Sequence, residues 1–199
     1  MQKMYKNYFS VYSCCIRNQV LGYFLPAKKR RNNDQNMKAV TIENQKSFTT
    51  HLFTRETFDG FLTTEASFST ATDFTLDGHI NPDYLSEDEL LLPENKEGIV
   101  FWKKVRPLCF EIIKGKKLPL RFKIVFMLSS GAVRRFLERS DLAFDPAQVN
   151  ALFLNVNYQE GKLVCTTGIS LKTFSLDKSL EHAWDAYAEK FLNQVQELA

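Results

Sequence analysis

Two stretches of this chain alternate apolar and polar residues, turn, and then alternate again. The first runs from Phe58 to Ile80, and the second runs from Ala151 to Leu171 with a turn at Glu160-Gly161. Successive side chains of a strand point to opposite faces, so this pattern predicts β-hairpins with one buried face and one face in water. The two hairpins therefore define a sheet against which the other elements must pack.

Helical periodicity and apolar runs alternate through the rest of the chain. The predicted elements are a strand at Lys38–Ile42, a helix at 44–54, the first hairpin, a helix at 99–113, a strand at Leu120–Leu128, a helix at 132–139, the second hairpin and a closing helix from Ser175 or Asp177 to about Glu197. The strand at Leu120–Leu128 is apolar at almost every position from Phe122, so we expect it at the centre of the sheet with both faces covered. The fold class that follows is α+β: a single domain over residues 37–199, with a largely antiparallel sheet and helices on one face.

The two halves of this domain, about 37–116 and 117–199, show the same order of strand, helix, hairpin and helix. Their closing helices also share one apolar stripe at matching offsets, led by Trp102 and Trp184, the only tryptophans in the chain. This agreement predicts an internal βαββα duplication with a pseudo-twofold axis. The alternative is that two ordinary amphipathic helices happen to share one apolar spacing.

The net charge of +3 belongs to the first 36 residues. This leader holds seven Lys or Arg against a single acid, Asp34, which leaves 19 basic and 22 acidic side chains in residues 37–199. The domain is therefore slightly acidic, and its net charge does not favour nucleic-acid binding. We expect no membrane span either, because Arg17-Asn18-Gln19 interrupts the apolar run of the leader.

Three interpretations of the leader, residues 1–36, are open. It is a peripheral membrane or nucleic-acid arm, a partner-binding arm, or a stretch that is disordered or not part of the natural protein. The composition changes abruptly at Met37, where a strand pattern begins. This change favours the third interpretation and a mature protein that starts at Met37.

The four cysteines do not form a metal or disulfide pattern. Cys14 and Cys15 are adjacent in the leader, whereas Cys109 and Cys165 are isolated within apolar runs. The spacing does not suit zinc, and the number is too small for a disulfide scaffold. We therefore expect buried thiols that act as small hydrophobes in a reducing cytoplasm, with no metal and no other cofactor.

The first hairpin carries the best cluster of titratable groups. A three-residue loop that begins at Ala71 would place Glu65 opposite His79 and Ser67 opposite Asp77 on the polar face. A carboxylate beside a histidine stabilises the charged imidazole and orients its ring, so Glu65, Asp77 and His79 are candidate catalytic residues. The alternative is plain surface electrostatics on a wet sheet face.

Basic residues in the second half suggest a place for an anion. Lys123 and Arg135 are candidate ligand-binding residues, and Ser129-Ser130-Gly131 precedes a helix whose N–H groups could bind a phosphate. The alternative is an ordinary helix cap beside solvated basic faces. The chain has no nucleophile elbow, phosphate loop, dinucleotide fingerprint or zincin motif. His51 and His182 lie on predicted helices and are expected to be structural or solvent-facing.

A set of short motifs lies between Phe58 and Leu90. They are Phe58-Asp59, Glu65-Ala66, Asp77-Gly78-His79-Ile80, and Tyr84 ahead of Ser86-Glu87-Asp88-Glu89-Leu90. In these residues the chain resembles the uncharacterised bacterial domain-of-unknown-function family 5721. The resemblance would extend over residues 37–199 and implies a start at Met37. It implies no activity.

We favour a non-enzymatic cytoplasmic module that binds a protein partner or self-associates. The lack of a catalytic motif supports this hypothesis, and the acidic segment Ser86–Glu97 is typical of a mobile flap or a docking segment. The competing hypothesis is a small enzyme or ligand-binding protein that uses the polar face of the first hairpin. Its residues would be Glu65, Asp77 and His79, with Lys123 or Arg135 holding an anion.

Overall fold

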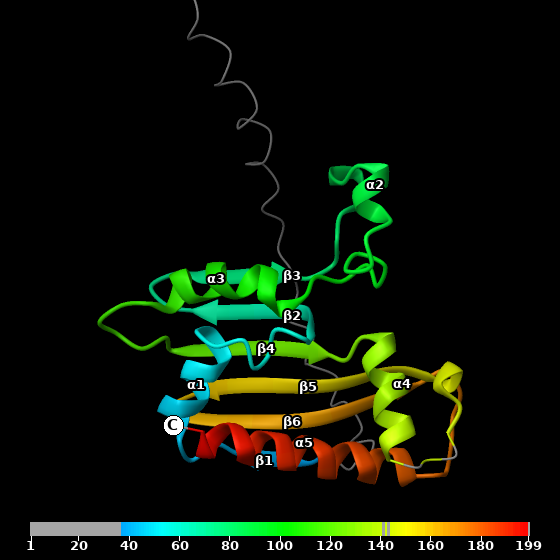
Figure 1. The fold of residues 1–199 in the computed structure, drawn as a ribbon. Helices are drawn as coiled ribbons and strands as arrows, with labels where there is room; N and C mark the ends of the chain where they lie inside the picture. Colours follow the sequence, from blue (N-terminus) through cyan, green and yellow to red (C-terminus); the bar gives the residue numbers. More distant parts are fainter. Residues whose placement is uncertain (1–36, 141, 143, 199) are drawn as a thin grey trace, which may run out of the picture. The chain divides into compact units, whose positions relative to one another are not determined.

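A six-stranded antiparallel sheet forms the centre of the fold (Figure 1). The structure is a computed structural model that describes residues 37–140, 142 and 144–198. The strands are β1 (Ala39–Thr41), β2 (Leu62–Ser69), β3 (Asp73–Asp77), β4 (Arg121–Met127), β5 (Val149–Gln159) and β6 (Lys162–Leu171). They lie side by side in the order β1-β6-β5-β4-β2-β3, and every neighbouring pair is antiparallel. The predicted sheet and both predicted hairpins are confirmed.

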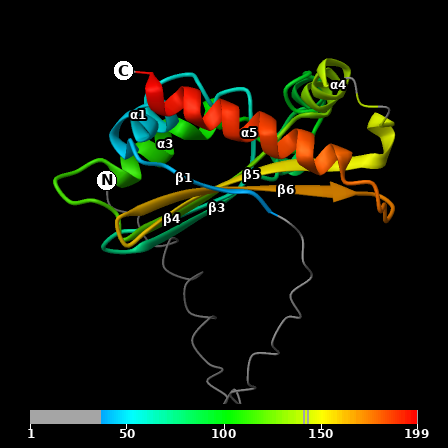
Figure 2. The same cartoon turned by 90° about the horizontal axis from the view of Figure 1, so that it is seen from below.

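The larger helices cover one side of this sheet. The helices are α1 (Gln45–Phe53), α2 (Glu87–Leu90), α3 (Trp102–Ile113), α4 (Ser130–Arg139) and α5 (Ser179–Glu197), with short 3-10 turns η1 (Pro82–Tyr84) and η2 (Pro146–Gln148). Figure 2 shows α1, α3, α4 and α5 on the same side of the strands, and each buries an apolar stripe. The α+β fold with helices on one face, predicted from the sequence, is therefore confirmed.

Local sequence signals explain how these helices begin and continue. The side chain of Asn44 accepts a hydrogen bond from the Ser47 N–H and caps α1, and the Ser129 hydroxyl caps α4 in the same way. Pro107 lies inside α3, which runs unbroken on both sides of it. The proline therefore does not divide the helix.

The core lies between the helices and the sheet and is rich in aromatic rings. Phe58, which is fully buried, contacts four other phenylalanine rings at centroid distances of 5.4 to 6.0 Å. Trp102 and Trp184 are also buried, and their indole N–H groups donate to the backbone carbonyls of Leu52 and Phe153 at 2.8 and 3.0 Å. Both large rings therefore enter the core without an unsatisfied donor.

The central strand β4 has one covered face, and the prediction that both its faces are covered is wrong. Phe122, Ile124 and Phe126 are buried beneath the helices, while Arg121 and Lys123 point to the other side and are exposed. The sequence misleads because Val125 and Met127, on the uncovered side, extend the apolar run although they are only half-buried. The central position of β4, between β5 and β2, is confirmed.

The order of elements repeats between the halves, but their places in the sheet do not. β1 lies at an edge beside β6, whereas β4, the strand that opens the second half, lies between β5 and β2. A twofold axis would give the two opening strands equivalent neighbours. The internal duplication is therefore not confirmed and stays a prediction.

The described residues from 37 to 198 form one compact unit. The expectations for residues 1–36, including Cys14 and Cys15, concern a segment outside the described residues. Within the part of the chain that the structure describes, no helix is long and apolar enough to cross a membrane.

Candidate functional site

The first hairpin has a different register from the predicted one. Glu65 lies opposite Asp77, and Ser67 lies opposite Thr75, because the three-residue loop begins one residue earlier than expected. The predicted pairs of Glu65 with His79 and of Ser67 with Asp77 are therefore wrong. The side of the sheet on which these side chains lie was predicted correctly, because the partners moved by an even number of residues.

Asp77 and His79 form a short-range pair at the end of β3. The carboxylate of Asp77 accepts hydrogen bonds from the backbone N–H of His79 at 3.0 Å and from its Nδ1 at 2.6 Å. These two bonds, the backbone one first, lower the pKa of Asp77 below its ordinary value. The His79 and Asp77 side chains are 67% and 76% exposed. An exposed carboxylate with a lowered pKa is a weak base near neutral pH. This geometry therefore favours a structural role, in which Asp77 holds the backbone at His79, over acid–base chemistry.

Glu65 pairs with Lys123 instead of with a histidine. The Glu65 carboxylate lies 3.2 Å from the Lys123 ammonium group across β2 and β4, and each side chain is 45% exposed. Ion pairs of this exposure contribute about 0–1 kcal/mol. The structure therefore gathers Glu65, Asp77 and Lys123 on one sheet face, with opposite charges already paired.

Gly78 has a structural reason to be glycine that the sequence did not reveal. A Cβ atom at this position would lie 1.6 Å from the carbonyl oxygen of Thr63, although the backbone of Gly78 is not left-handed. The close approach occurs where β2 bulges at Thr64, and where residues 98–102 insert between the start of β2 and the chain after β3. The glycine of the Asp77-Gly78 motif therefore allows two backbone segments, at Gly78 and at Thr63, to approach each other closely.

The N-terminus of α4 already holds an anion, and that anion belongs to the chain. A carboxylate oxygen of Glu97 accepts hydrogen bonds from the backbone N–H and the hydroxyl of Ser130 at 2.8 and 2.6 Å. Arg135 lies on the exposed side of α4, above the helix-covered face of the sheet. The two predicted ligand-binding residues, Lys123 and Arg135, are thus not brought together.

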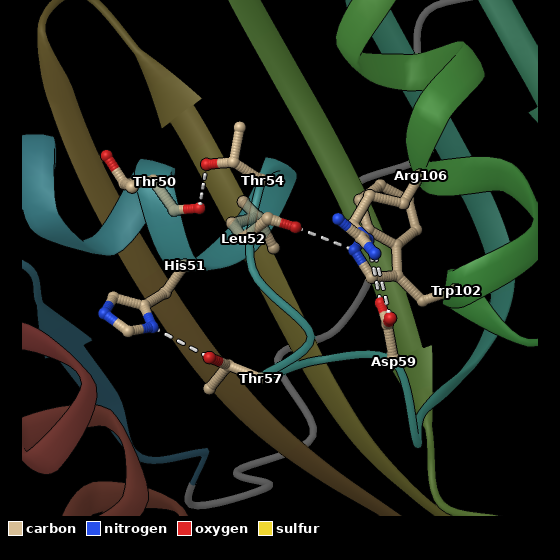
Figure 3. A network of polar contacts seen from close by, with 8 residues as sticks. All are labelled: Thr50, His51, Leu52, Thr54, Thr57, Asp59, Trp102 and Arg106. Atoms are coloured by element: carbon tan, nitrogen blue, oxygen red, sulfur yellow. Dashed lines mark hydrogen bonds and ion pairs between the residues drawn. The ribbon is translucent and has the colours of Figure 1, made fainter.

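A polar network that the sequence did not predict links α1, the following loop and α3 (Figure 3). Asp59 receives two hydrogen bonds from the guanidinium of Arg106, at 2.8 and 2.9 Å, and both side chains are 17% exposed. His51 is half-buried on α1 and bonds the Thr57 hydroxyl at 2.8 Å. The Phe58-Asp59 motif was visible in the sequence, but its partner lies 47 residues away, and nothing local points to Arg106.

The described cysteines are small core residues, as predicted. Cys109 and Cys165 are free and buried. Burial raises the pKa of Cys109 to about 12 and raises that of Cys165 further. Among the described residues, no group of three or more His, Cys, Asp or Glu side chains is arranged to hold a metal ion.

The side of the sheet away from the helices is not covered by any element that the structure describes. We call it the open face and define it by the outward side chains of the central strands: Glu65, Ser67, Lys123, Val125, Asn155, Asn157, Val164 and Thr166. Its polar groups bond one another, since the Asn155 amide donates to the Thr166 hydroxyl at 3.3 Å. Val125 and Val164 lie half-buried among these polar groups.

A shallow groove of about 400 Å³ lies across β3, β2, β4 and β5 near the hairpin tips. Arg121, Lys123 and Asn157 are among its lining residues, whereas Glu65, Asp77 and His79 are not. The groove therefore includes one of the predicted ligand-binding residues but none of the three candidate catalytic residues.

The fold and these surfaces define a small α+β protein with an uncovered sheet face. The model of a family of unknown function (DUF5721) matches residues 51–198, which is most of the chain. The protein belongs to this family, as the resemblance of its first-half motifs indicated. No curated protein and no solved structure matches the chain.

Proposed function

We propose that this protein is a non-enzymatic module that binds a protein partner or self-associates, with the open face as its main binding surface. The observation that carries the proposal is the placement of α1, α3, α4 and α5 on one side of a six-stranded sheet (Figure 2). The opposite side presents Val125 and Val164 half-buried between polar side chains.

The size of the open face suits a protein partner. Each strand residue covers about 16 Å², so the sheet presents roughly 700 Å² on one side. Each partner in a standard protein–protein interface contributes about 800 Å². A mixture of apolar and polar groups is also typical of such interfaces, whose composition resembles that of the general protein surface.

The polar groups of the first hairpin support binding better than catalysis. Glu65 is paired with Lys123, and Asp77 is bound by His79, so the charges are satisfied on an exposed surface. General acid–base catalysis needs groups whose pKa lies near the working pH, whereas the pKa of Asp77 is lowered.

Ligand binding is a second candidate function because of the groove. Its volume of about 400 Å³ falls within the range of small-molecule sites, and Arg121 and Lys123 both point to this side of β4. An anionic small molecule is the ligand class that these cations fit. Thermal unfolding with a panel of anionic metabolites tests this candidate. A stabilisation that Arg121→Ala abolishes supports it, and a panel without any stabilisation counts against it.

Further parts of the proposal concern the cellular setting. We place the protein in the cytoplasm, which the free thiols of Cys109 and Cys165 support because a reducing compartment keeps such thiols unpaired. Its bacterial origin rests on the resemblance stated above. Fractionation of the host cell tests the location, and recovery of the protein outside the cytoplasm would contradict it.

The main proposal is tested by capture of partners with an open-face variant and a matched control. Val125→Arg adds a charge to the centre of the open face, and Arg134→Glu changes a charge on the exposed side of α4. We expect wild type and Arg134→Glu to retain one and the same partner, by affinity capture and quantitative mass spectrometry, and Val125→Arg to lose it at least tenfold. A partner retained equally by Val125→Arg would refute the assignment of the open face.

A further inference from the structure

A structured arm projects from the domain between β3 and α3. We call residues 81–97 the arm; it contains η1 and α2 (Figure 1). Ser86 and Glu89 form a capping box at the start of α2, and the Asn95 amide donates to the Glu89 carbonyl at 2.8 Å. Glu94 forms ion pairs with Lys103 and Lys104 on α3, at 3.4 and 2.6 Å. The arm is therefore held in a defined shape.

The surface of the arm is both apolar and acidic. Tyr84 is 87% exposed and Leu91 is 72% exposed, and Leu90 and Leu92 are exposed beside them. The arm carries six acidic side chains and one lysine. Three of the acids, Asp83, Glu87 and Asp88, are exposed and form no ion pair in the part of the chain that the structure describes. Neighbouring exposed apolar side chains of this size are typical of an interaction surface.

The loop between α3 and β4 is the chemical counterpart of the arm. We call residues 114–120 the basic loop. It has three lysines and no acid, and Leu118 and Leu120 are 80% and 70% exposed. Lys116 and Lys117 are exposed and form no ion pair with any described residue. The basic loop thus presents exposed leucines beside positive charges, and the arm presents exposed leucines beside negative charges, so the two surfaces are complementary.

The arm and the basic loop cannot meet within one molecule. The arm ends just before α3, and the basic loop begins just after it, so the twelve residues of α3 separate them. A helix of this length spans about 18 Å, and Figure 1 shows the two segments at opposite ends of α3. A contact between them needs a second copy of the chain.

We infer that the arm of one copy docks on the basic loop of another, with leucines packing together and the carboxylates of the arm facing Lys116 and Lys117. This inference rests on the self-associating form of the proposed function, but it uses a surface other than the open face. Because the two halves of the contact differ, the copy that gives its arm retains an unused loop, and the copy that gives its loop retains an unused arm. The assembly is therefore head-to-tail: it either closes into a ring, of which a reciprocal dimer is the smallest, or grows into an open chain.

A mixing experiment with two single variants of the full chain tests the inference. Leu91→Arg disables the arm and leaves the basic loop intact, whereas Leu118→Glu disables the loop and leaves the arm intact. Both positions are exposed, so we expect stability to change by no more than about 0.5 kcal/mol. Light scattering after size exclusion should show wild type associating at low salt and dissociating at high salt, since exposed charges are screened.

The expected result is specific to a head-to-tail contact. Each variant alone should be monomeric, and an equal mixture should form a dimer of twice the mass of one chain, because one intact arm then meets one intact loop. Phe174→Glu, at an 89% exposed position in neither surface, should leave the assembly unchanged. A monomeric wild type, a variant that still assembles alone, or a mixture that stays monomeric would each overturn the inference.

The test also separates this inference from the proposed function. Val125→Arg should preserve the arm–loop assembly, because the open face takes no part in it. If Val125→Arg abolishes self-association while Leu91→Arg and Leu118→Glu preserve it, the inference fails and the proposed function stands. If the mixture forms a dimer and no partner depends on Val125, the arm–loop contact stands and the open-face proposal fails.

Discussion

Gly78→Ala is expected to destabilise the domain by about 3 kcal/mol. The added Cβ atom would lie 1.6 Å from the Thr63 carbonyl oxygen, whereas real Cβ contacts are essentially never under 3.0 Å. The obstacle is backbone, so no side-chain rotation relieves it. The chain at Gly78 and β2 would have to separate by about 1.4 Å, which is 3.0 minus 1.6 Å.

This separation breaks the hydrogen bonds that hold the crossing together. The Gly78 N–H donates to the Thr64 carbonyl at 3.0 Å, and the Gly78 carbonyl accepts from the Val100 N–H at 2.9 Å. The Thr63 N–H also donates to the Val100 carbonyl at 2.9 Å. Bonds lengthened by more than about 1 Å are lost. Three bonds at about 1 kcal/mol each give about 3 kcal/mol, which corresponds to a Tm lower by roughly 6–12 °C.

Urea unfolding followed by tryptophan fluorescence measures this change, because Trp102 and Trp184 are both buried. Gly60→Ala is the matched control, since nothing lies within 4 Å of the Cβ position of Gly60 and its φ is not positive. We expect the control to stay within about 0.5 kcal/mol of wild type. A loss below about 1 kcal/mol for Gly78→Ala, or an equal loss for both variants, would refute the steric argument.

Three further predictions concern buried contacts and ionisation. Asp59→Asn should lower stability by about 1–3 kcal/mol, because the half-buried guanidinium of Arg106 loses a two-bond charged partner; a change under about 0.5 kcal/mol in urea unfolding would contradict this. Stability should fall on acidification, since hydrogen bonds and lysines lower the folded pKa of groups such as Asp77 and Glu94. The stabilisation from a lowered carboxyl pKa is fully present above the pKa of the unfolded state, and it is lost as the pH falls through the pKa of the folded state. The urea midpoint should therefore drop between about pH 5 and pH 3, and it should not change between pH 8 and about pH 6. With the two leader cysteines replaced by serine, a thiol reagent near pH 8 should label the protein only after unfolding, because burial raises the pKa of Cys109 to about 12; fast labelling of the native state would refute this.

The sequence predicts those features of the fold that depend on residues close to one another in the chain. Alternation over a few positions identified the strands of both hairpins, and apolar spacing identified the helices α1, α4 and α5. The class of fold followed from these elements, because a one-sided sheet and amphipathic helices have few ways to cover each other's apolar faces.

Features that depend on distant residues, or on the exact residue at which a loop begins, were not accessible in this way. The pairing of Asp59 with Arg106 joins residues 47 positions apart, and the register of the first hairpin was set by a loop whose start differed by one residue. β4 was predicted to be covered on both faces because the half-buried Val125 and Met127 extend its apolar run, although the helices were expected on one face of the sheet. A partner distant in the sequence decides the pairing of Asp59, whereas the conformation of the loop itself decides the hairpin register.

The Asp77-Gly78-His79 motif shows that a prediction from neighbouring residues alone can assign catalysis to residues whose role is to hold the backbone. Its carboxylate holds the His79 N–H, and its glycine admits the Thr63 carbonyl, so two of its three residues are explained by the crossing of chains. The binding hypotheses use different surfaces, the open face and the arm with its basic loop. Substitutions at Gly78 should therefore act through stability, whereas Val125→Arg and Leu91→Arg should change binding or assembly in a protein that is still folded. If Asp77→Asn removed partner binding without any loss of stability, this division would be wrong, and the motif would belong to the binding surface.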